Sequence, residues 1–283
     1  MKITKITLGL AMLTIVATSS LSSCKKREVI EKDSDTSAAL DETFSSTIAN
    51  DMNTISDEAA GGNGLSSFRL VESNSVLNAC TTIERDTMNP KKTITVNFGA
   101  TGCPGNDGRI RKGSLIISFT GRYRDSLTVI TIKPKDYFVN DHQVTGSKTI
   151  TNKGHNSANH LVHTINANLQ IIKPSGGGTI TRQINRQREW IAGENTFDRT
   201  DDIYAITGSA TGTNSNGNTV TTVITSPLIR NMSSVDCRRH FTKGTLEHTP
   251  AGKATRYVDF GNGACDNQAV VTINGNAYNI TLK

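Results

Sequence analysis

The 283-residue sequence lacks several features that would narrow its function. Aromatic residues make up 5% of it, with one tryptophan, and the apolar fraction is 35%. It contains no GxSxG, HExxH or P-loop pattern, so common motifs of hydrolysis and nucleotide binding are missing. Beyond residue 16 no segment is apolar enough to cross a membrane, which takes about 20 such residues. We therefore expect a lean core and no enzyme activity.

The one long apolar run lies at the N-terminus and has the three parts of a secretory signal. Lys2 and Lys5 form a cationic start, residues 6–16 are almost wholly apolar, and small residues follow. The segment Leu21-Ser22-Ser23-Cys24 resembles the bacterial lipobox, in which an aliphatic and two small residues precede a cysteine. This resemblance implies cleavage just before the cysteine and acylation of Cys24, for example with palmitate. An ordinary signal peptide with a chance cysteine is the alternative.

Cleavage at this point sets the expected domain organisation. We predict a lipoprotein signal peptide over 1–23, a lipidated tether over 24–40, a helix over 41–60 and a single all-β domain over 65–283. The tether is charged and has few apolar side chains. Loss of Lys2 and Lys5 lowers the formal net charge from +6 to +4, a mildly basic value that identifies no partner.

A lipid on the mature N-terminus predicts a location in the cell envelope. The residue after the acylated cysteine is Lys25 and not the aspartate associated with inner-membrane retention in enteric bacteria, which favours the outer membrane. The membrane is then a partner through the N-terminal lipid. Nucleic acid is not expected as a partner outside the cytoplasm.

The cysteines indicate an internal duplication. With Cys24 lipidated, four of the five cysteines remain, an even number that predicts disulfides in an oxidising compartment. The similar segments 96–99 and 258–261 each end in Phe-Gly, and each is followed four residues later by a cysteine, Cys103 or Cys265. A further cysteine precedes each segment, so the pattern repeats after about 160 residues.

A turn sequence lies midway between Cys80 and Cys103 and again midway between Cys237 and Cys265. Folding each segment about its turn brings its two cysteines together at the open end of a hairpin. We therefore predict the disulfides Cys80–Cys103 and Cys237–Cys265. A metal site or a redox pair is the alternative, but neither spacing resembles CxxC and no histidine follows at zinc-ligand distance.

A single helix is predicted near the N-terminus of the mature chain. Four apolar residues recur at intervals of four, four and three and share one helical face; they are Phe44, Ile48, Met52 and Ile55. Asp41 is the candidate N-cap, and Gly61-Gly62 is the candidate stop. We expect the stripe to pack on a sheet and not to bind a partner.

From about residue 67 to the end, short runs rich in Thr, Val and Ile alternate with turn signals. Tight connections between consecutive runs are predicted at 121–126, 139–142, 176–178, 216–217 and 274–275. Alternation of Thr and Ser with aliphatic residues indicates a sheet that is solvated on one face. The pattern predicts an all-β fold, an antiparallel meander of about 12 to 15 strands forming a curled sheet, half-barrel or sandwich.

Arginines spaced by two are the main candidate ligand contacts, because each pair shares one face of a strand. The pairs are Arg109 and Arg111, Arg122 and Arg124, and Arg186 and Arg188. On neighbouring strands they would form a cationic strip, but the preferred interpretation is a solvated outer face. Trp190 is either a stacking platform for a sugar or, as preferred, a core or edge anchor. The candidate ligand-binding residues are Arg122, Arg124, Arg186, Arg188 and Trp190.

No metal site, cofactor or catalytic residue is predicted. His155, His160 and His163 lie close in sequence, but the last two are three apart and face opposite sides of a strand. The segment Gly105-Asn106-Asp107-Gly108 lacks the further carboxylates of an EF-type calcium loop and is interpreted as a plain turn.

The lipobox, the long Thr- and Asn-rich meander and the segments 186–193 and 206–214 resemble uncharacterised secreted lipoproteins of Bacteroidetes-type Gram-negative bacteria. The resemblance covers nearly the whole mature chain and implies envelope placement, but it carries over no functional residue. The expected function is a non-catalytic binding or scaffolding module for a protein, glycan or amphiphile.

Two other functions remain open. One is a periplasmic or surface carrier of an amphiphilic ligand in a curled β-sheet groove. A dry cavity open to solvent would favour that carrier, and a filled interior would count against it. The other is a hydrolase, which would need a cleft with two converging carboxylates or a metal.

Overall fold

A computed structural model describes residues 33–60, 75–86, 92–196 and 198–282. The expected signal peptide and Cys24 lie outside these ranges, as does the candidate helix stop at Gly61-Gly62. The chain divides into two units after Lys32, and the unit described here is Asp33–Lys283. None of the helices in the described ranges has the length and apolar character needed to cross a membrane.

The helices are α1 (Ser37–Ala60) and α2 (Val235–Arg239), with short 3-10 helices at Pro174–Gly176 and Arg199–Asp201. The first strands are β1 (Thr82–Asp86), β2 (Lys92–Asn97), β3 (Cys103–Pro104), β4 (Ile110–Phe119), β5 (Val129–Val139), β6 (His142–His155) and β7 (Leu161–Ile172). The remaining strands are β8 (Thr179–Ala192), β9 (Ile203–Thr213), β10 (Thr219–Asn231), β11 (Lys243–Pro250), β12 (Arg256–Asn262), β13 (Gln268–Ile273) and β14 (Asn276–Thr281).

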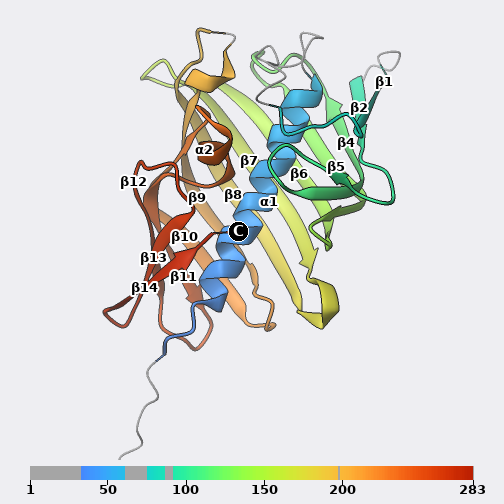
Figure 1. The fold of residues 1–283 in the computed structure, drawn as a ribbon. Helices are drawn as coiled ribbons and strands as arrows, with labels where there is room; N and C mark the ends of the chain where they lie inside the picture. Colours follow the sequence, from blue (N-terminus) through green and yellow to red (C-terminus); the bar gives the residue numbers. More distant parts are fainter. Residues whose placement is uncertain (1–32, 61–74, 87–91, 197, 283) are drawn as a thin grey trace, which may run out of the picture. The chain divides into compact units, whose positions relative to one another are not determined.

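All these strands form one 14-stranded antiparallel sheet in which strands that follow one another in sequence are paired. The exception is at β3: β2 pairs with β4 and not with β3, and the short β3 pairs with β4 as well. The sheet begins at β1, ends at β14, and curls without closing (Figure 1). The predicted all-β meander is confirmed, and its curled form replaces the sandwich alternative. Each predicted tight connection joins two consecutive strands, including the Asn274-Gly275 turn, where both residues have the positive φ of a type I′ turn.

Glycines let the sheet curl where neighbouring strands approach closely. Gly146 of β6 has φ of 107°, and a Cβ there would lie 2.0 Å from the carbonyl oxygen of Asn168 in β7. Gly208 of β9 has φ of 114°, and its Cβ would lie 2.4 Å from the carbonyl oxygen of Asn185 in β8. Such positions are open only to glycine and bend the strands that contain them.

Helix α1 runs along the inner face of the curled sheet (Figure 1). Its predicted apolar stripe packs into the core, because Ile48, Met52 and Ile55 are each at most 1% exposed among side chains of β2 to β9. The helix begins at Ser37, where the Asp35 carboxylate accepts a hydrogen bond from the Ser37 amide at 2.9 Å. The predicted start at residue 41 is therefore wrong, and residues 37–40, the end of the tether expected over 24–40, are helical.

Asp41 is not an N-cap. It lies inside α1, where its carboxylate accepts hydrogen bonds from Lys173 Nζ and from the Ser215 amide at 2.5 and 2.8 Å. Most of the helix is buried on every side, including polar residues, which a single apolar stripe does not predict. The physical reason is that the sheet offers charged partners to the polar faces of α1.

Both predicted disulfides are present, with Cα–Cα distances of 5.7 Å for Cys80–Cys103 and 4.4 Å for Cys237–Cys265. The first closes the open end of the β1–β2 hairpin, where Thr82 pairs with Asn97. The second links α2 to the segment after β12, beyond the point where Lys243 pairs with Asn262. Each disulfide stabilises its segment by about 3 kcal/mol on the chain-entropy account.

Candidate functional site

Strand β8 directs its arginines toward α1 and not toward solvent. Arg182, Arg186 and Arg188 are 1%, 5% and 3% exposed, whereas Gln183 and Gln187, which alternate with them, are exposed. Arg109 and Arg111 are also buried. The preferred interpretation of a solvated outer face is therefore wrong for these arginines, because carboxylates of the buried helix draw them inward.

Glu42 of α1 shows how completely one of these carboxylates is satisfied. Arg182 Nε and Arg186 Nη2 donate to its two oxygens at 3.0 and 2.9 Å. The hydroxyls of Ser46 and Thr222 add hydrogen bonds at 3.0 and 3.1 Å. Burial raises the pKa of Glu42, but Arg182 and Arg186 outweigh it and hold the pKa at about 2. Glu42 is thus an ionised anchor between helix and sheet.

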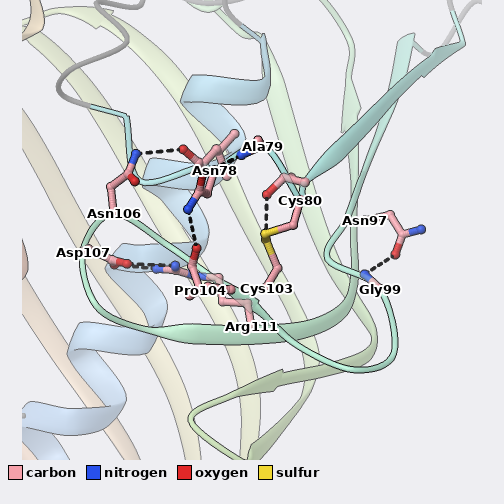
Figure 2. Close-up of a disulfide and its surroundings, with 12 residues drawn as sticks. Asn78, Ala79, Cys80, Asn97, Gly99, Cys103, Pro104, Asn106, Asp107 and Arg111 are labelled. Carbon is pink, nitrogen blue, oxygen red and sulfur yellow. Dashed lines mark hydrogen bonds and ion pairs between the residues drawn. A yellow bond between two sulfur atoms is a disulfide. The ribbon is translucent and has the colours of Figure 1, made fainter.

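A second carboxylate pair holds the middle of α1. Arg111 Nε and Nη2 donate to Asp51 of the helix at 3.1 and 2.6 Å. The Arg111 Nη1 and Nη2 atoms donate to Asp107 at 2.9 and 2.6 Å, beside the Cys80–Cys103 disulfide (Figure 2). The segment 105–108 is therefore more than a plain turn, since it supplies a buried carboxylate to the helix–sheet interface.

A buried lysine also contacts the helix. Lys148 Nζ donates to the carbonyl oxygen of Ala49 at 2.6 Å. Burial, followed by the charges of Arg188 and Arg230, lowers the pKa of Lys148 well below its usual value. Burial also raises the pKa of Asp57, against the opposing effect of Arg188, Arg199, Arg230 and Lys148.

Four arginines and two aspartates line a small cavity, the arginine pocket. It is lined by Thr47, Asn50, Asp51, Thr54, Val76, Asp107, Arg109, Arg230, Val235, Arg238 and Arg239. Its volume is about 10 Å³, which admits roughly one water-sized group. Five buried N–H-bearing atoms of these lining arginines have no hydrogen-bond partner among the residues that the structure describes; they are Nη2 of Arg109, Nε of Arg230, Nε and Nη2 of Arg238, and Nε of Arg239.

The two acidic residues of the pocket are already engaged. Asp51 and Asp107 both bind Arg111, and Arg109 Nη1 lies 3.5 Å from Asp51 and 3.2 Å from Asp107. The side chains of Arg238 and Arg239 make no hydrogen bond or ion pair with any residue in the described ranges. Burial, and next the charges of Arg199 and Arg188, lower the pKa of Arg230 to about 9.

The arginine pocket is built by the two disulfide-linked segments together. One segment supplies Val76, Asp107 and Arg109 around Cys80–Cys103, and the other supplies Arg238 and Arg239 next to Cys237. Both lie against the middle of α1, whose residues Thr47 to Thr54 complete the wall. The duplicated cysteine pattern therefore converges on one place in the fold.

The five candidate ligand-binding residues do not form one site. Arg122 and Arg124 lie in the connection between β4 and β5 and not on a strand, and Arg122 is exposed. The Arg124 guanidinium lies 4.8 Å from the centre of the Trp190 ring and donates to the carbonyl oxygen of Glu194. Trp190 is 2% exposed, and its Nε1 donates to Asp202 at 3.0 Å. It is a core anchor, as the sequence favoured.

The three clustered histidines are separated by the fold. His163 is buried against Tyr123, with ring centroids 5.0 Å apart. His155 and His160 face outward and contact Glu194 and Glu189 at 2.7 Å. Across the residues with described positions, no three His, Cys, Asp or Glu side chains are grouped as a metal site would need.

A second hollow, the apolar cavity, lies at the N-terminal end of α1. It measures about 340 Å³ and is lined by Ser37, Leu40, Asp41, Thr43, Phe44, His142, Lys173, Pro174 and Gly177. It is larger than the arginine pocket, and Leu40, Phe44 and Pro174 provide its apolar surface. The inner face of the sheet itself is occupied by α1, so the continuous groove expected of a carrier is filled along the helix.

Comparison with known proteins gives no functional assignment: no family model, curated protein or solved structure matches this chain. The candidate site therefore depends on its own geometry. Sequence reasoning missed Arg238, Arg239 and Asp107. The available signal was the basic pair directly after Cys237, together with the repeat that relates Cys237 to Cys80.

Proposed function

We propose that this chain is a lipid-anchored binding module of the cell envelope that uses the arginine pocket as its ligand contact. The placement follows from the signal sequence and Cys24, with Lys25 favouring the outer membrane. The binding role follows from one observation, the convergence of Arg109, Arg238 and Arg239 with unpaired N–H groups on a cavity between two disulfide-linked segments.

Physical chemistry supports a binding role for such a pocket. A buried N–H group without an acceptor costs about 1 to 3 kcal/mol, so several in one cavity weaken the free protein. A ligand oxygen that accepts from them recovers this cost and makes charge-assisted hydrogen bonds. Disulfides on both sides keep the arginines in place before the ligand arrives, which lowers the entropy lost on binding.

The alternative proposal is a carrier of an amphiphile. It is favoured by the apolar cavity, where Leu40 and Phe44 of α1 face Pro174. Helix α1 fills the inner face of the sheet, so this cavity and not a groove along the sheet would hold the apolar part. A ligand seated there would contact the start of α1, close to the predicted tether.

Two experiments test the proposed function. Metabolic labelling with an alkyne analogue of palmitate should mark the wild-type chain, and Cys24→Ala should abolish the label. A photo-reactive amino acid at position 235, which lines the pocket and is partly exposed but is not one of its arginines, should form an adduct in envelope preparations, whereas the same group at exposed position 122 should not. An unlabelled wild-type chain contradicts the anchor, and adducts that are equal at both positions contradict the site.

A further inference from the structure

We infer that the arginine pocket binds one oxygen of a phosphoryl group. This inference deepens the proposed function and uses its site, but it names a ligand chemistry and is tested on purified protein.

The donors around the pocket fit an oxyanion. Arg109, Arg230 and Arg238 are 7%, 5% and 5% exposed, so their guanidinium groups meet a ligand with little competition from water. Together with Arg239 Nε, these three arginines have five buried N–H-bearing atoms that find no acceptor in the described ranges. Arginine presents planar, forked donors that match phosphoryl and carboxylate oxygens, and it stays charged in such surroundings.

Local charge also favours a phosphoryl group over a neutral ligand. Arg111 already binds both pocket carboxylates, Asp51 and Asp107, through four hydrogen bonds. Arg109 Nη1 also lies 3.5 Å from Asp51 and 3.2 Å from Asp107, so Arg109 and Arg111 match these two negative charges. The positive charges of Arg230, Arg238 and Arg239 have no further carboxylate among the residues that line the cavity. His240 adds no positive charge at neutral pH, because burial, followed by the charges of Arg109 and Arg239, lowers its pKa to about 4.

The size of the pocket limits how the ligand enters. A volume of about 10 Å³ accepts a single oxygen and excludes a whole phosphorylated molecule. The rest of the ligand must therefore stay outside, next to Arg239, which is only partly buried. A phosphate carried on a larger envelope molecule, either a phosphorylated glycan or a phospholipid headgroup, has this arrangement of a small charged end on a bulky body.

The test is thermal unfolding of the full-length protein at constant ionic strength with inorganic phosphate, acetate or chloride. Phosphate should raise the unfolding midpoint in proportion to the logarithm of its concentration above saturation, and acetate and chloride should not. Arg238→Met and Arg239→Gln should each weaken phosphate binding about 10-fold to 100-fold, because each removes charge-assisted hydrogen bonds. Arg122→Met, which makes the same charge change at an exposed turn, should bind as wild type.

Two soluble phosphate esters distinguish the source. Glucose 1-phosphate represents a phosphorylated glycan, and glycerophosphoglycerol represents a phospholipid headgroup; preferential binding of either one supports the pocket and identifies the class. An equal response to acetate or chloride, or a phosphate response that persists in both Arg238→Met and Arg239→Gln, would overturn the inference.

Failure of this inference is separable from failure of the proposed function. If the wild-type chain takes up the palmitate label and ignores phosphate, while the variant with the photo-reactive residue at position 235 forms the adduct, only the phosphoryl assignment is rejected. A chain that binds phosphate but carries no label at Cys24 rejects only the lipid anchor.

Discussion

Two parts of the helix–sheet interface use arginine in different ways. Around Glu42, two arginines and two hydroxyls direct four donors at the two oxygens of one carboxylate. Around the arginine pocket, Asp51 and Asp107 are already bound by Arg111, yet Arg109, Arg238 and Arg239 surround an opening. The Glu42 carboxylate is fully hydrogen-bonded within the protein, whereas N–H groups of the arginines around the pocket lack acceptors in the described ranges.

This difference separates a structural role for arginine from a binding role. Both regions contain some orphaned N–H groups, including Nη2 of Arg182 near Glu42, so an unpaired nitrogen alone does not mark a site. The distinguishing feature is an opening lined by guanidinium groups, two of which make no pairing at all in the described part of the chain.

The largest effect should come from Glu42→Gln. Removing the charge leaves Arg182 and Arg186 buried without their counter-ion, which costs about 3 to 5 kcal/mol in the free energy of unfolding. Chemical denaturation measures this cost, with Glu84→Gln on the exposed face of β1 as the matched control. A change below about 1 kcal/mol, the range of an exposed pair, would show that the Glu42 network is not the anchor described.

The disulfides should have the next largest effect. Replacing Cys237 and Cys265 together by serine should lower the free energy of unfolding by about 2 to 4 kcal/mol, and the Cys80–Cys103 pair should cost a similar amount because the closed segments are alike in length. Loss of either disulfide should also weaken phosphate binding, since each holds one wall of the pocket. Unchanged phosphate affinity in both double variants would contradict a preformed pocket.

A third prediction concerns pH and Asp202. Burial raises its pKa from 3.8 to about 7, so the folded chain retains a proton that the unfolded chain has released. The free energy of unfolding should therefore fall as pH rises from about 4 to about 7 and stay level above that, as far as this group contributes. Trp190, the one tryptophan, donates to Asp202 and reports the change by fluorescence.

Asp202→Asn should abolish that fluorescence titration. A wild-type Trp190 signal that does not titrate near pH 7 would show that Asp202 is ionised throughout.

Glu42 gives the opposite trend of stability with pH, at lower pH. Its pKa of about 2 lies below the ordinary 4.5, so its stabilising contribution is lost as pH falls through this range.

The smallest effect on stability should come from Arg238→Met. Its side chain has no hydrogen-bond or ion-pair partner in the part of the chain that the structure describes, and methionine removes two buried, unsatisfied N–H groups. The free energy of unfolding without ligand should stay within about 1 kcal/mol of wild type or rise. Arg182→Met, which breaks a paired arginine of similar burial, should be clearly destabilising under the same conditions. Equal losses in the two variants would erase the distinction between the regions.

Sequence patterns predicted the strands, their turns and both disulfides, because each depends on local spacing. They did not predict the inward arginines of β8, since Arg alternating with Gln looks the same on a buried and an exposed face. The acidic residues of α1 held the missing information, but pairing Glu42 with Arg182 and Arg186 requires a register across 140 residues and more. The arginine pocket was hidden for the same reason, because Asp107 and Arg239 meet only through the curl of the sheet.

The most direct test combines the two regions in one measurement, the free energy of unfolding of Glu42→Gln and Arg238→Met with and without inorganic phosphate. The account predicts that Glu42→Gln loses about 3 to 5 kcal/mol in both conditions and keeps the gain from phosphate. It predicts that Arg238→Met keeps the stability of the free protein and loses most of that gain. A phosphate gain that survives in Arg238→Met at wild-type size would contradict it.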